Sequence, residues 1–225
     1  MAKRATAKAQ KAEEAAYLAG ARAQLLDAAE ALFSERGYNG VSTRDIAARA
    51  GVNLGSIPYY FGSKENLLKE VLRRRATPEL EDRAAGVKKV LDDAGSKAPD
   101  VVAILRADLE PVFRRRRENA VHRRLAGRLS TDPSPEVRRA VSEIYSRRAI
   151  VFDTALRRAC PHLSHDEFYW RFYCLFGAVQ YVLADVGKIQ TFAGKTFDSS
   201  NPEEALRNVI PFLAAGLRAP AQFGK

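Results

Sequence analysis

A short apolar pattern interrupted by one glycine, in residues 41–61, constrains the fold of this chain more than any other feature. Ser42 and Asp45 have the spacing of a capping box, which starts a helix, and Gly51 can supply the left-handed backbone that ends it. Ala47 is small enough to lie where two helices cross closely. The pattern therefore predicts two short helices that cross steeply at a tight turn.

Apolar residues on both sides of that turn have the spacing needed to pack on a supporting helix. Ile46 and Ile57 fall on the inward faces of the two short helices, and the supporting helix precedes them, ending at Gly37. Asn53 can cap the second short helix, which we expect over residues 54–60. The sequence thus predicts a three-helix unit, whose supporting helix contributes Leu25, Ala29, Leu32 and Phe33.

Nearly every other segment also has the pattern of a helix. Strand-like alternation is absent, and Ala, Leu, Arg and Glu dominate, which predicts an all-α fold. Arg73–Arg75 followed by Thr77-Pro78 marks a boundary, so we expect a basic N-terminal arm over 1–20 and domains over 21–75 and 76–225. Further helices are expected from Ser63 to this boundary and over residues 78–94, 100–116, 118–130, 135–159, 166–188 and 202–217, the last opened by Asn201-Pro202, with a loop over 190–200.

The chain carries an excess of positive charge, with 37 Lys and Arg against 27 Asp and Glu, for a net charge of +10. Such an excess favours a polyanion partner, most simply nucleic acid, with ordinary solubility as the alternative. The densest basic cluster, Arg114–Arg117 with Arg123, Arg124 and Arg128, indicates a solvated face, with binding of a CoA phosphate or long-range attraction to DNA as the alternative. No run of 18 apolar residues or secretory signal occurs, and Cys160 and Cys174 make no disulfide framework, so we expect a cytoplasmic protein without a membrane partner.

The outward face of the two short helices is small, polar and aromatic, which argues against a helical hairpin that merely packs inside a core. In a helix-turn-helix motif the second helix enters the major groove of double-stranded DNA, and residues near its start reach base edges. Lys64 begins the next helix, where its charge and the free N–H groups suit a phosphate. The residues that we expect to contact operator DNA are Thr43, Arg44, Asn53, Leu54, Gly55, Ser56, Tyr59, Tyr60 and Lys64.

The run from Thr43 to Ala47, followed by Gly51-Val52-Asn53 and by residues 59–68, resembles the DNA-binding domain of the TetR family. The likeness covers residues 22–72. It implies a three-helix domain that reads DNA, a C-terminal helical domain that dimerises and binds a small molecule, and repression of transcription. One position departs, because Pro58 stands where the family usually has a Tyr or a similar residue. We expect Pro58 to remove one hydrogen bond from a very short helix and to make no hydrogen bond to DNA; a more rigid helix and a contact to a thymine methyl group are the two alternatives for its role.

The segment from Asp166 to Lys188 is apolar on nearly every side. Such a helix must be buried on nearly every side, which one subunit of this size seldom achieves. The last helix ends in Ala214-Ala215-Gly216, which permits close approach of another helix. We therefore expect these two helices to form a four-helix homodimer interface, with an intramolecular core as the alternative. A homodimer would also place two reading helices about 34 Å apart, on successive major grooves of a palindrome.

The second domain more loosely resembles the fatty-acid-responsive PsrA-like branch of the TetR family, in residues 168–172, 175–178, 181–185 and 212–220. This resemblance implies a small hydrophobic effector, such as an acyl chain or acyl-CoA. Arg171 interrupts an apolar helix and is suited to meet a carboxylate, with a structural ion pair or a surface position as the alternative. We expect the effector to be bound by Trp170, Arg171, Phe172, Tyr173, Phe176 and Tyr181.

Two other classes of function remain as alternatives. A metal-dependent enzyme would use Cys160, His162 and His165, but Pro161 and the capping Ser164 place these residues in a turn between helices, and no second cluster supplies further zinc ligands. The sequence has no Gly-rich phosphate loop and no nucleophile motif, so we expect no enzyme, no metal and no cofactor. The other alternative is a helical dimer that binds a small molecule without binding DNA.

Overall fold

The computed structural model describes residues 20–115, 120–184, 189–194, 197–198 and 201–222, and every regular element among them is a helix, which confirms the all-α fold. The expected N-terminal arm, apart from Gly20, lies outside the described residues. None of the helices described is long and apolar enough to cross a bilayer. A first helix covers residues 20–36 and is followed by α2 (Thr43–Ala50), α3 (Ser56–Phe61), α4 (Lys64–Ala94), α5 (Val101–Arg115), α6 (Ala120–Ser130), α7 (Pro135–Ala159), α8 (His165–Ala184), α9 (Gln190–Ala193) and α10 (Pro202–Arg218).

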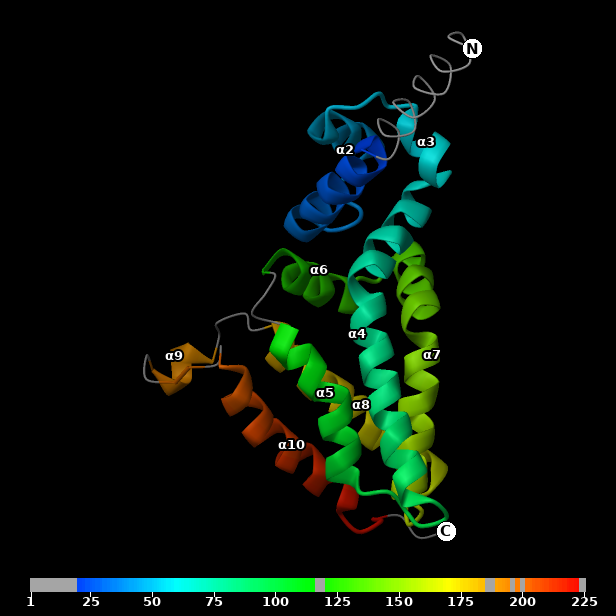
Figure 1. Ribbon diagram of the computed structural model, residues 1–225. Helices are drawn as coiled ribbons and strands as arrows, with labels where there is room; N and C mark the ends of the chain where they lie inside the picture. Colours follow the sequence, from blue (N-terminus) through cyan, green and yellow to red (C-terminus); the bar gives the residue numbers. More distant parts are fainter. Residues whose placement is uncertain (1–19, 116–119, 185–188, 195–196, 199–200, 223–225) are drawn as a thin grey trace, which may run out of the picture.

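One end of the elongated molecule is a three-helix unit that packs on the beginning of α4 (Figure 1). Leu25 and Phe33 of the first helix, Ile46 of α2 and Ile57 of α3 are all buried in one core, which Leu67 of α4 extends. Burial of large apolar side chains contributes roughly 1.5–3 kcal/mol each. The predicted supporting role of the first helix is therefore confirmed.

The fourth helix, α4, is continuous from Lys64 to Ala94, and the expected break at Thr77-Pro78 is wrong. Pro78 cannot donate an intrahelical hydrogen bond, but its side chain is exposed to solvent. Ala76 before it and Leu80 after it are buried. Packing of these neighbours outweighs the single lost bond. As a result, α4 runs from the three-helix unit deep into the rest of the molecule, alongside α7 (Figure 1).

The second core lies among the remaining long helices. Phe113 of α5, Phe152 of α7 and Phe168 of α8 are buried in it, and α10 adds Leu206 and Leu213. The expected loop over residues 190–200 is wrong at its start, because residues 190–193 form the short helix α9, which projects from the side of the molecule (Figure 1). In the sequence, α9 lies between α8 and α10.

The three-helix unit and the rest of the molecule share packing and polar contacts. Asn39 Nδ2, before α2, donates to Ser134 Oγ, before α7, at 2.8 Å. Lys69 of α4 pairs with Glu143 of α7 at 2.7 Å. Leu125 of α6 is fully buried in the core of the three-helix unit. The two halves of the chain are thus in direct mechanical contact.

Candidate nucleic-acid interface and effector cavity

The turn between α2 and α3 has the local geometry that its sequence predicts. Asp45 N donates to Ser42 Oγ at 3.1 Å and Ser42 N donates to Asp45 Oδ2 at 2.8 Å, which confirms the capping box. Ser42 Oγ also donates to Asp45 Oδ2, at 2.6 Å, and this hydrogen bond together with that from Ser42 N lowers the pKa of Asp45. Gly51 has φ 67° and ψ 28°, so the left-handed turn is also confirmed. Gly51 N then donates to Ala48 O at 3.2 Å and ends α2.

The reading helix α3 begins at Ser56, two residues later than predicted. Asn53 does not cap α3: its Oδ1 accepts from Gly55 N at 2.8 Å and forms a tight turn before the helix. Because α3 begins only at Ser56, the expected loss of a hydrogen bond within the helix at Pro58 is also wrong. Pro58 is the third residue of α3, and the N–H groups of the first turn of a helix have no partner within it.

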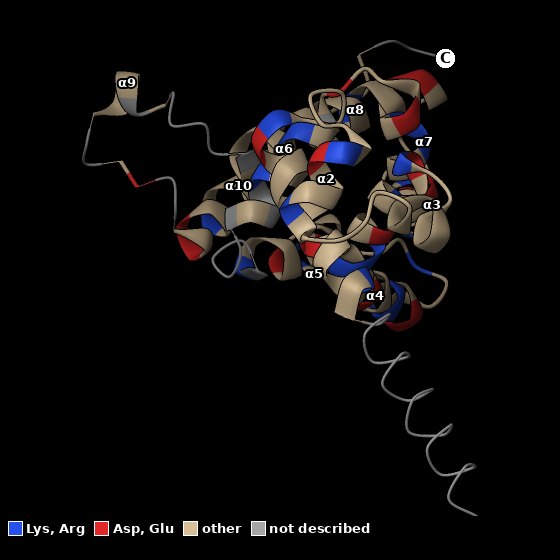
Figure 2. Ribbon diagram, turned by 90° about the horizontal axis from the view of Figure 1, so that it is seen from above, with Lys and Arg blue, Asp and Glu red and all other residues tan. Residues whose placement is uncertain are grey.

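The side of α3 that faces away from the core carries the predicted contact residues. Ile57 and Phe61 are buried and anchor the helix, whereas Asn53, Leu54 and Gly55 are exposed. The Tyr59 side chain is 72% exposed. Figure 2 looks onto this end of the molecule and shows α3 as a helix without charged residues. Ser56 and Tyr60 are half-buried, and Tyr60 packs with its ring edge on Tyr59, at 4.9 Å between centroids.

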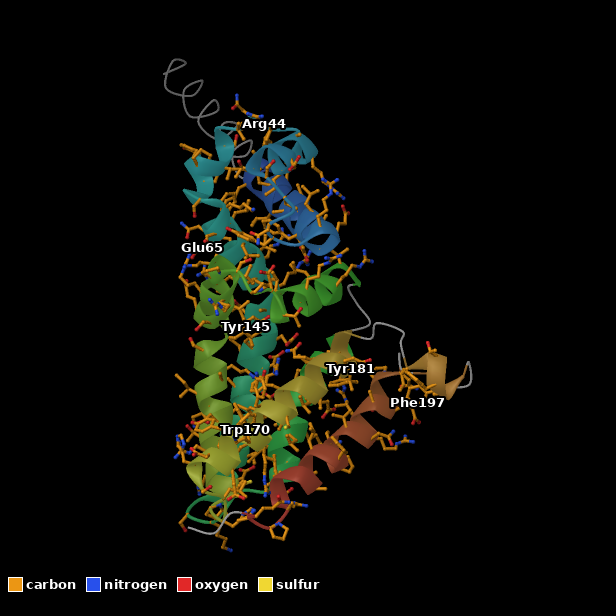
Figure 3. The ribbon with its side chains drawn as sticks, turned by 180° about the vertical axis from the view of Figure 1, so that it is seen from behind. Arg44, Glu65, Tyr145, Trp170, Tyr181 and Phe197 are labelled. Atoms are coloured by element: carbon orange, nitrogen blue, oxygen red, sulfur yellow. The ribbon has the colours of Figure 1, made fainter. Side chains whose placement is uncertain are left out.

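Cationic residues flank this uncharged helix. Arg44 of α2 is exposed at the end of the molecule (Figure 3), and Thr43 beside it is half-buried. Lys64 begins α4, with Nζ 4.0 Å from the centre of the Tyr38 ring. Burial lowers the pKa of Lys64. Aromatic contact restrains the ammonium group of Lys64 at the first turn of α4, where free N–H groups favour an anion.

A cavity of about 860 Å³ lies among α4, α5, α6, α7 and α8. Of the six predicted effector residues, Tyr173, Phe176 and Tyr181 line it, and Trp170, Arg171 and Phe172 do not. Phe172 packs instead on Phe152 and Phe168, with ring centres 5.8 Å and 5.6 Å away.

Arg171 caps another helix. Its Nη1 donates to Gly216 O at 3.0 Å and to Ala219 O at 2.6 Å, and its Nη2 donates to Pro220 O at 2.8 Å. These carbonyls lie at and beyond the carboxyl end of α10, where a cation is stabilised by the helix dipole. Arg171 Nη2 also lies 3.9 Å from Glu167 Oε1, so the structural ion pair that was the alternative for Arg171 is present, and the residue is not part of the cavity lining.

The polar end of the cavity is a buried ionic cluster that the sequence did not predict. Asp108 of α5 is 0% exposed and accepts hydrogen bonds from Arg83 of α4 and Arg148 of α7. Burial alone would raise the pKa of Asp108, but the two guanidinium groups together lower it. Tyr145, one turn before Arg148, also lines the cavity (Figure 3). Arg83 lies four residues after Glu79, a helical ion-pair spacing, but no sequence pattern links Asp108 to either arginine.

Large aromatic side chains are exposed on α8 and α10. Trp170, Tyr173 and Phe212 are 69%, 70% and 71% exposed, although Phe168 and Leu213 on the same two helices are buried. Exposed aromatic residues in such number on one helix pair are typical of an interaction surface.

The proposed metal ligands are not assembled into a site. Cys160 is buried, His162 Nε2 lies 3.2 Å from Ala219 O, and His165 Nδ1 lies 3.0 Å from Asp166 Oδ1. Among the residues whose placement is described, no group of three metal-binding side chains occurs. In the basic cluster Arg114–Arg117, Arg114 pairs with Glu110 at 2.5 Å, and Arg116 and Arg117 lie outside the described residues.

Comparison with known proteins finds two family models that match this chain. Residues 25–71 match "Bacterial regulatory proteins, tetR family", and residues 103–216 match "Tetracyclin repressor-like, C-terminal domain". The second match alone covers half of the chain. The first match covers the three-helix unit and the beginning of α4, and the second covers α5 to α10.

Curated relatives match over shorter stretches. The transcriptional repressor KstR2 of Rhodococcus jostii is 44% identical over 62 residues, 28% of this chain and 30% of that protein. KstR2 of Mycolicibacterium smegmatis is 33% identical over 116 residues, 51% of this chain and 54% of that protein. The chain thus spans about half the length, or less, of these relatives.

A solved structure resembles nearly the whole fold. The transcriptional regulator FadR of Bacillus subtilis, in complex with stearoyl-CoA, superposes with a TM-score of 0.56 at 19% sequence identity. The match covers 86% of this chain and 97% of that one. At this identity the likeness establishes the arrangement of helices.

Proposed function

The chain belongs to the TetR family of bacterial regulatory proteins, and on that basis we propose that it is a homodimeric, DNA-binding repressor that responds to a small hydrophobic effector. Residues 21–75 serve as the DNA-binding domain, residues 76–225 as the effector-binding and dimerisation domain, and residues 1–20 as a basic arm. Both KstR2 relatives carry the name of transcriptional repressors, which supports repression.

One observation carries the DNA-binding proposal. Helix α3 is held from below by the buried Ile57 and Phe61, while Tyr59 and the residues just before α3 remain exposed. A short helix that is anchored by its buried face and exposed to solvent on its outer face can enter a major groove without any local unfolding of the protein. Arg44, Lys64 and Thr43 flank it at positions suited to the phosphate backbone.

The test is selection of genomic fragments by the full-length protein, followed by mobility shifts on the recovered operator. Lys64→Ala should weaken binding to all fragments alike and lower the slope of log affinity against log salt by about one. Lys88→Ala is the matched control, because Lys88 is an exposed lysine on the far half of α4, paired with Asp92 at 2.5 Å. No enriched fragment, or equal behaviour of the two lysine variants, would refute DNA recognition by this surface.

Homodimerisation is proposed through α8 and α10. Trp170, Tyr173 and Phe212 expose large apolar surface there, and covering such surface drives association. Light scattering after size-exclusion chromatography should give a dimer for the wild type and a monomer for Phe212→Arg. Tyr59→Ala removes an equally exposed aromatic residue from α3 and should lose DNA affinity while remaining dimeric. A monomeric wild type at micromolar concentration contradicts the proposal.

An acyl compound is the proposed effector. The cavity is lined largely by apolar side chains, and the FadR structure that resembles this fold contains stearoyl-CoA. An effector that releases DNA must bind the non-DNA conformation better, by about 1–3 kcal/mol of coupling. Oleate and oleoyl-CoA, titrated into the protein–operator complex, should release DNA; retention of the complex with both compounds rejects an acyl effector.

A further inference from the structure

We propose that the cavity selects an amphiphile with an anionic head group, which Tyr145 and Arg148 of α7 bind while the apolar part lies along α8. The inference rests on the proposed role of the cavity as an effector site. It assigns the head group to residues that lie more than twenty positions away from Arg171, which the sequence had suggested for this role.

Two donors point at the same space from one turn of α7. Arg148 uses Nε and Nη2 on Asp108, with Nε at 2.8 Å from Oδ1. Within the described part of the chain, Arg148 Nη1 and the Tyr145 hydroxyl make no hydrogen bond to protein, yet neither is a fully buried atom. Both side chains line the cavity, so these two donors are open to a ligand inside it.

The compensating charge at this end of the cavity is shared unevenly, although the cluster of Arg83, Arg148, Glu79 and Asp108 is neutral as a whole. Arg83 pairs with both Glu79 and Asp108, at 2.9 Å each. Among the described residues Asp108 is the only carboxylate paired with Arg148, whose guanidinium otherwise lies 4.9 and 5.9 Å from the ring centres of Phe152 and Phe176. Burial and the nearby charge of Arg83 lower the pKa of Arg148 despite the attraction of Asp108. A buried cation in this situation gains from an added anion, and planar guanidinium groups match carboxylate geometry well.

Tyr145 adds selectivity against cationic and uncharged head groups. Burial, reinforced by the negative charge of Glu79, raises the pKa of Tyr145 to about 12. Its hydroxyl therefore stays protonated at neutral pH and is available as a donor. A donor pair of one hydroxyl and one guanidinium nitrogen favours an anionic acceptor over an alcohol and disfavours an ammonium group.

The rest of the cavity suits an apolar chain. Phe176, Val179 and Leu183 line it from α8, and Leu109 and Leu129 line it from α5 and α6. Its volume of about 860 Å³ falls within the range of known small-molecule sites, roughly 300–1,000 Å³. An elongated amphiphile can thus place its head on α7 and its chain between α6 and α8.

Calorimetric titration of the full-length protein with three matched probes tests the proposal without DNA. Decanoate, 1-decanol and decylammonium share one chain and differ in head charge. We expect decanoate to bind at least about tenfold more tightly than decanol, the scale of a charge-assisted hydrogen bond, and decylammonium not to bind. Equal binding of decanoate and decanol, or no binding of decanoate, overturns the inference.

Single-residue variants test which side chains cause the preference for decanoate over decanol. Tyr145→Phe should weaken decanoate binding about tenfold and leave decanol unchanged. Tyr169→Phe is the matched control, since it removes a hydroxyl on α8 outside the cavity lining, and should leave the ratio of the two affinities unchanged. Arg148→Met should abolish the preference; if that variant fails to fold, Tyr145→Phe alone decides. A Tyr145→Phe protein that keeps the wild-type ratio refutes the assignment.

The two proposals can fail separately. A protein that prefers decanoate but enriches no genomic fragment keeps the head-group site and loses the proposed function as a DNA-binding regulator. A protein that binds an operator but takes up decanol as well as decanoate keeps DNA recognition and loses the head-group site.

Discussion

Removing the charge of Asp108 should destabilise the folded protein strongly, although the shape of the side chain is kept in Asp108→Asn. Asp108 is 0% exposed and is the only carboxylate, among the described residues, that pairs with Arg148. In the variant, the amide can accept fewer of the guanidinium hydrogen bonds, and its own NH₂ group faces donors. Arg148 would then be a buried cation without a counter-charge, while Arg83 would keep Glu79.

The expected loss follows from that burial. Breaking a buried ion pair by removing one partner costs about 3–5 kcal/mol, because the remaining charge is left desolvated. For a chain of 150–250 residues, 1 kcal/mol corresponds to a change of about 2–4 °C in melting temperature. Asp108→Asn should therefore melt roughly 6–20 °C below the wild type.

Thermal unfolding and urea titration, each at one fixed protein concentration, provide the assay. Asp92→Asn is the control, because the Lys88–Asp92 pair has side chains that are 69% and 61% exposed, and exposed pairs contribute under about 1 kcal/mol. If Asp108→Asn lost no more stability than this control, the cluster would not be a desolvated network, and the reasoning would be refuted.

Three further outcomes are expected. Since the folded-state pKa of Asp108 is lowered, its charge contributes fully to the free energy of unfolding above the unfolded-state pKa of about 3.9, and this contribution is lost as the pH falls below that value. The difference in stability between wild type and Asp108→Asn, measured by urea unfolding, should therefore narrow below about pH 4 and not at pH 6. Gly51→Ala should cost about 1 kcal/mol through left-handed strain alone, because nothing lies within 4 Å of the added methyl group, and Gly51→Asn should cost less; equal stability of the alanine variant and the wild type in the same assay would exclude strain at this turn. Ile57→Ala should lose about 2–5 kcal/mol of stability, whereas the exposed Leu54→Ala should stay within about 0.5 kcal/mol and weaken only operator binding, so comparable destabilisation of the two variants would contradict the orientation of α3.

Local signals could be predicted because they act between neighbours in the chain. The Ser42–Asp45 capping box and the left-handed Gly51 need only three or four residues to be satisfied. Asn201 is a further example: its Oδ1 accepts from Glu203 N at 3.0 Å and begins α10 where its sequence indicates. Periodicity likewise identified the buried face of α3, because one exposed and one buried side are inherent in a short helix on a core.

Errors arose where the result depended on packing between distant segments. Pro78 lies inside α4, since buried neighbours hold that helix to α5 and α7. The sequence left open whether Arg171 meets a ligand or has a structural role, because the carbonyls that accept its hydrogen bonds lie more than forty residues away. A charged residue in an apolar helix does not reveal its partner, which is set by the neighbouring helix that packs there.

The amino-acid sequence by itself determined most of the helices, the turn between α2 and α3, and the family to which the chain belongs, because caps, glycine turns and apolar spacing are properties of short segments. Only the tertiary structure decided where charge meets the cavity. Arg83, Asp108 and Arg148 are separated by 25 and 40 residues and come from three different helices. Their meeting reflects which helix faces pack together, and that depends on the burial of apolar surface across the whole molecule rather than on the pattern within any one helix.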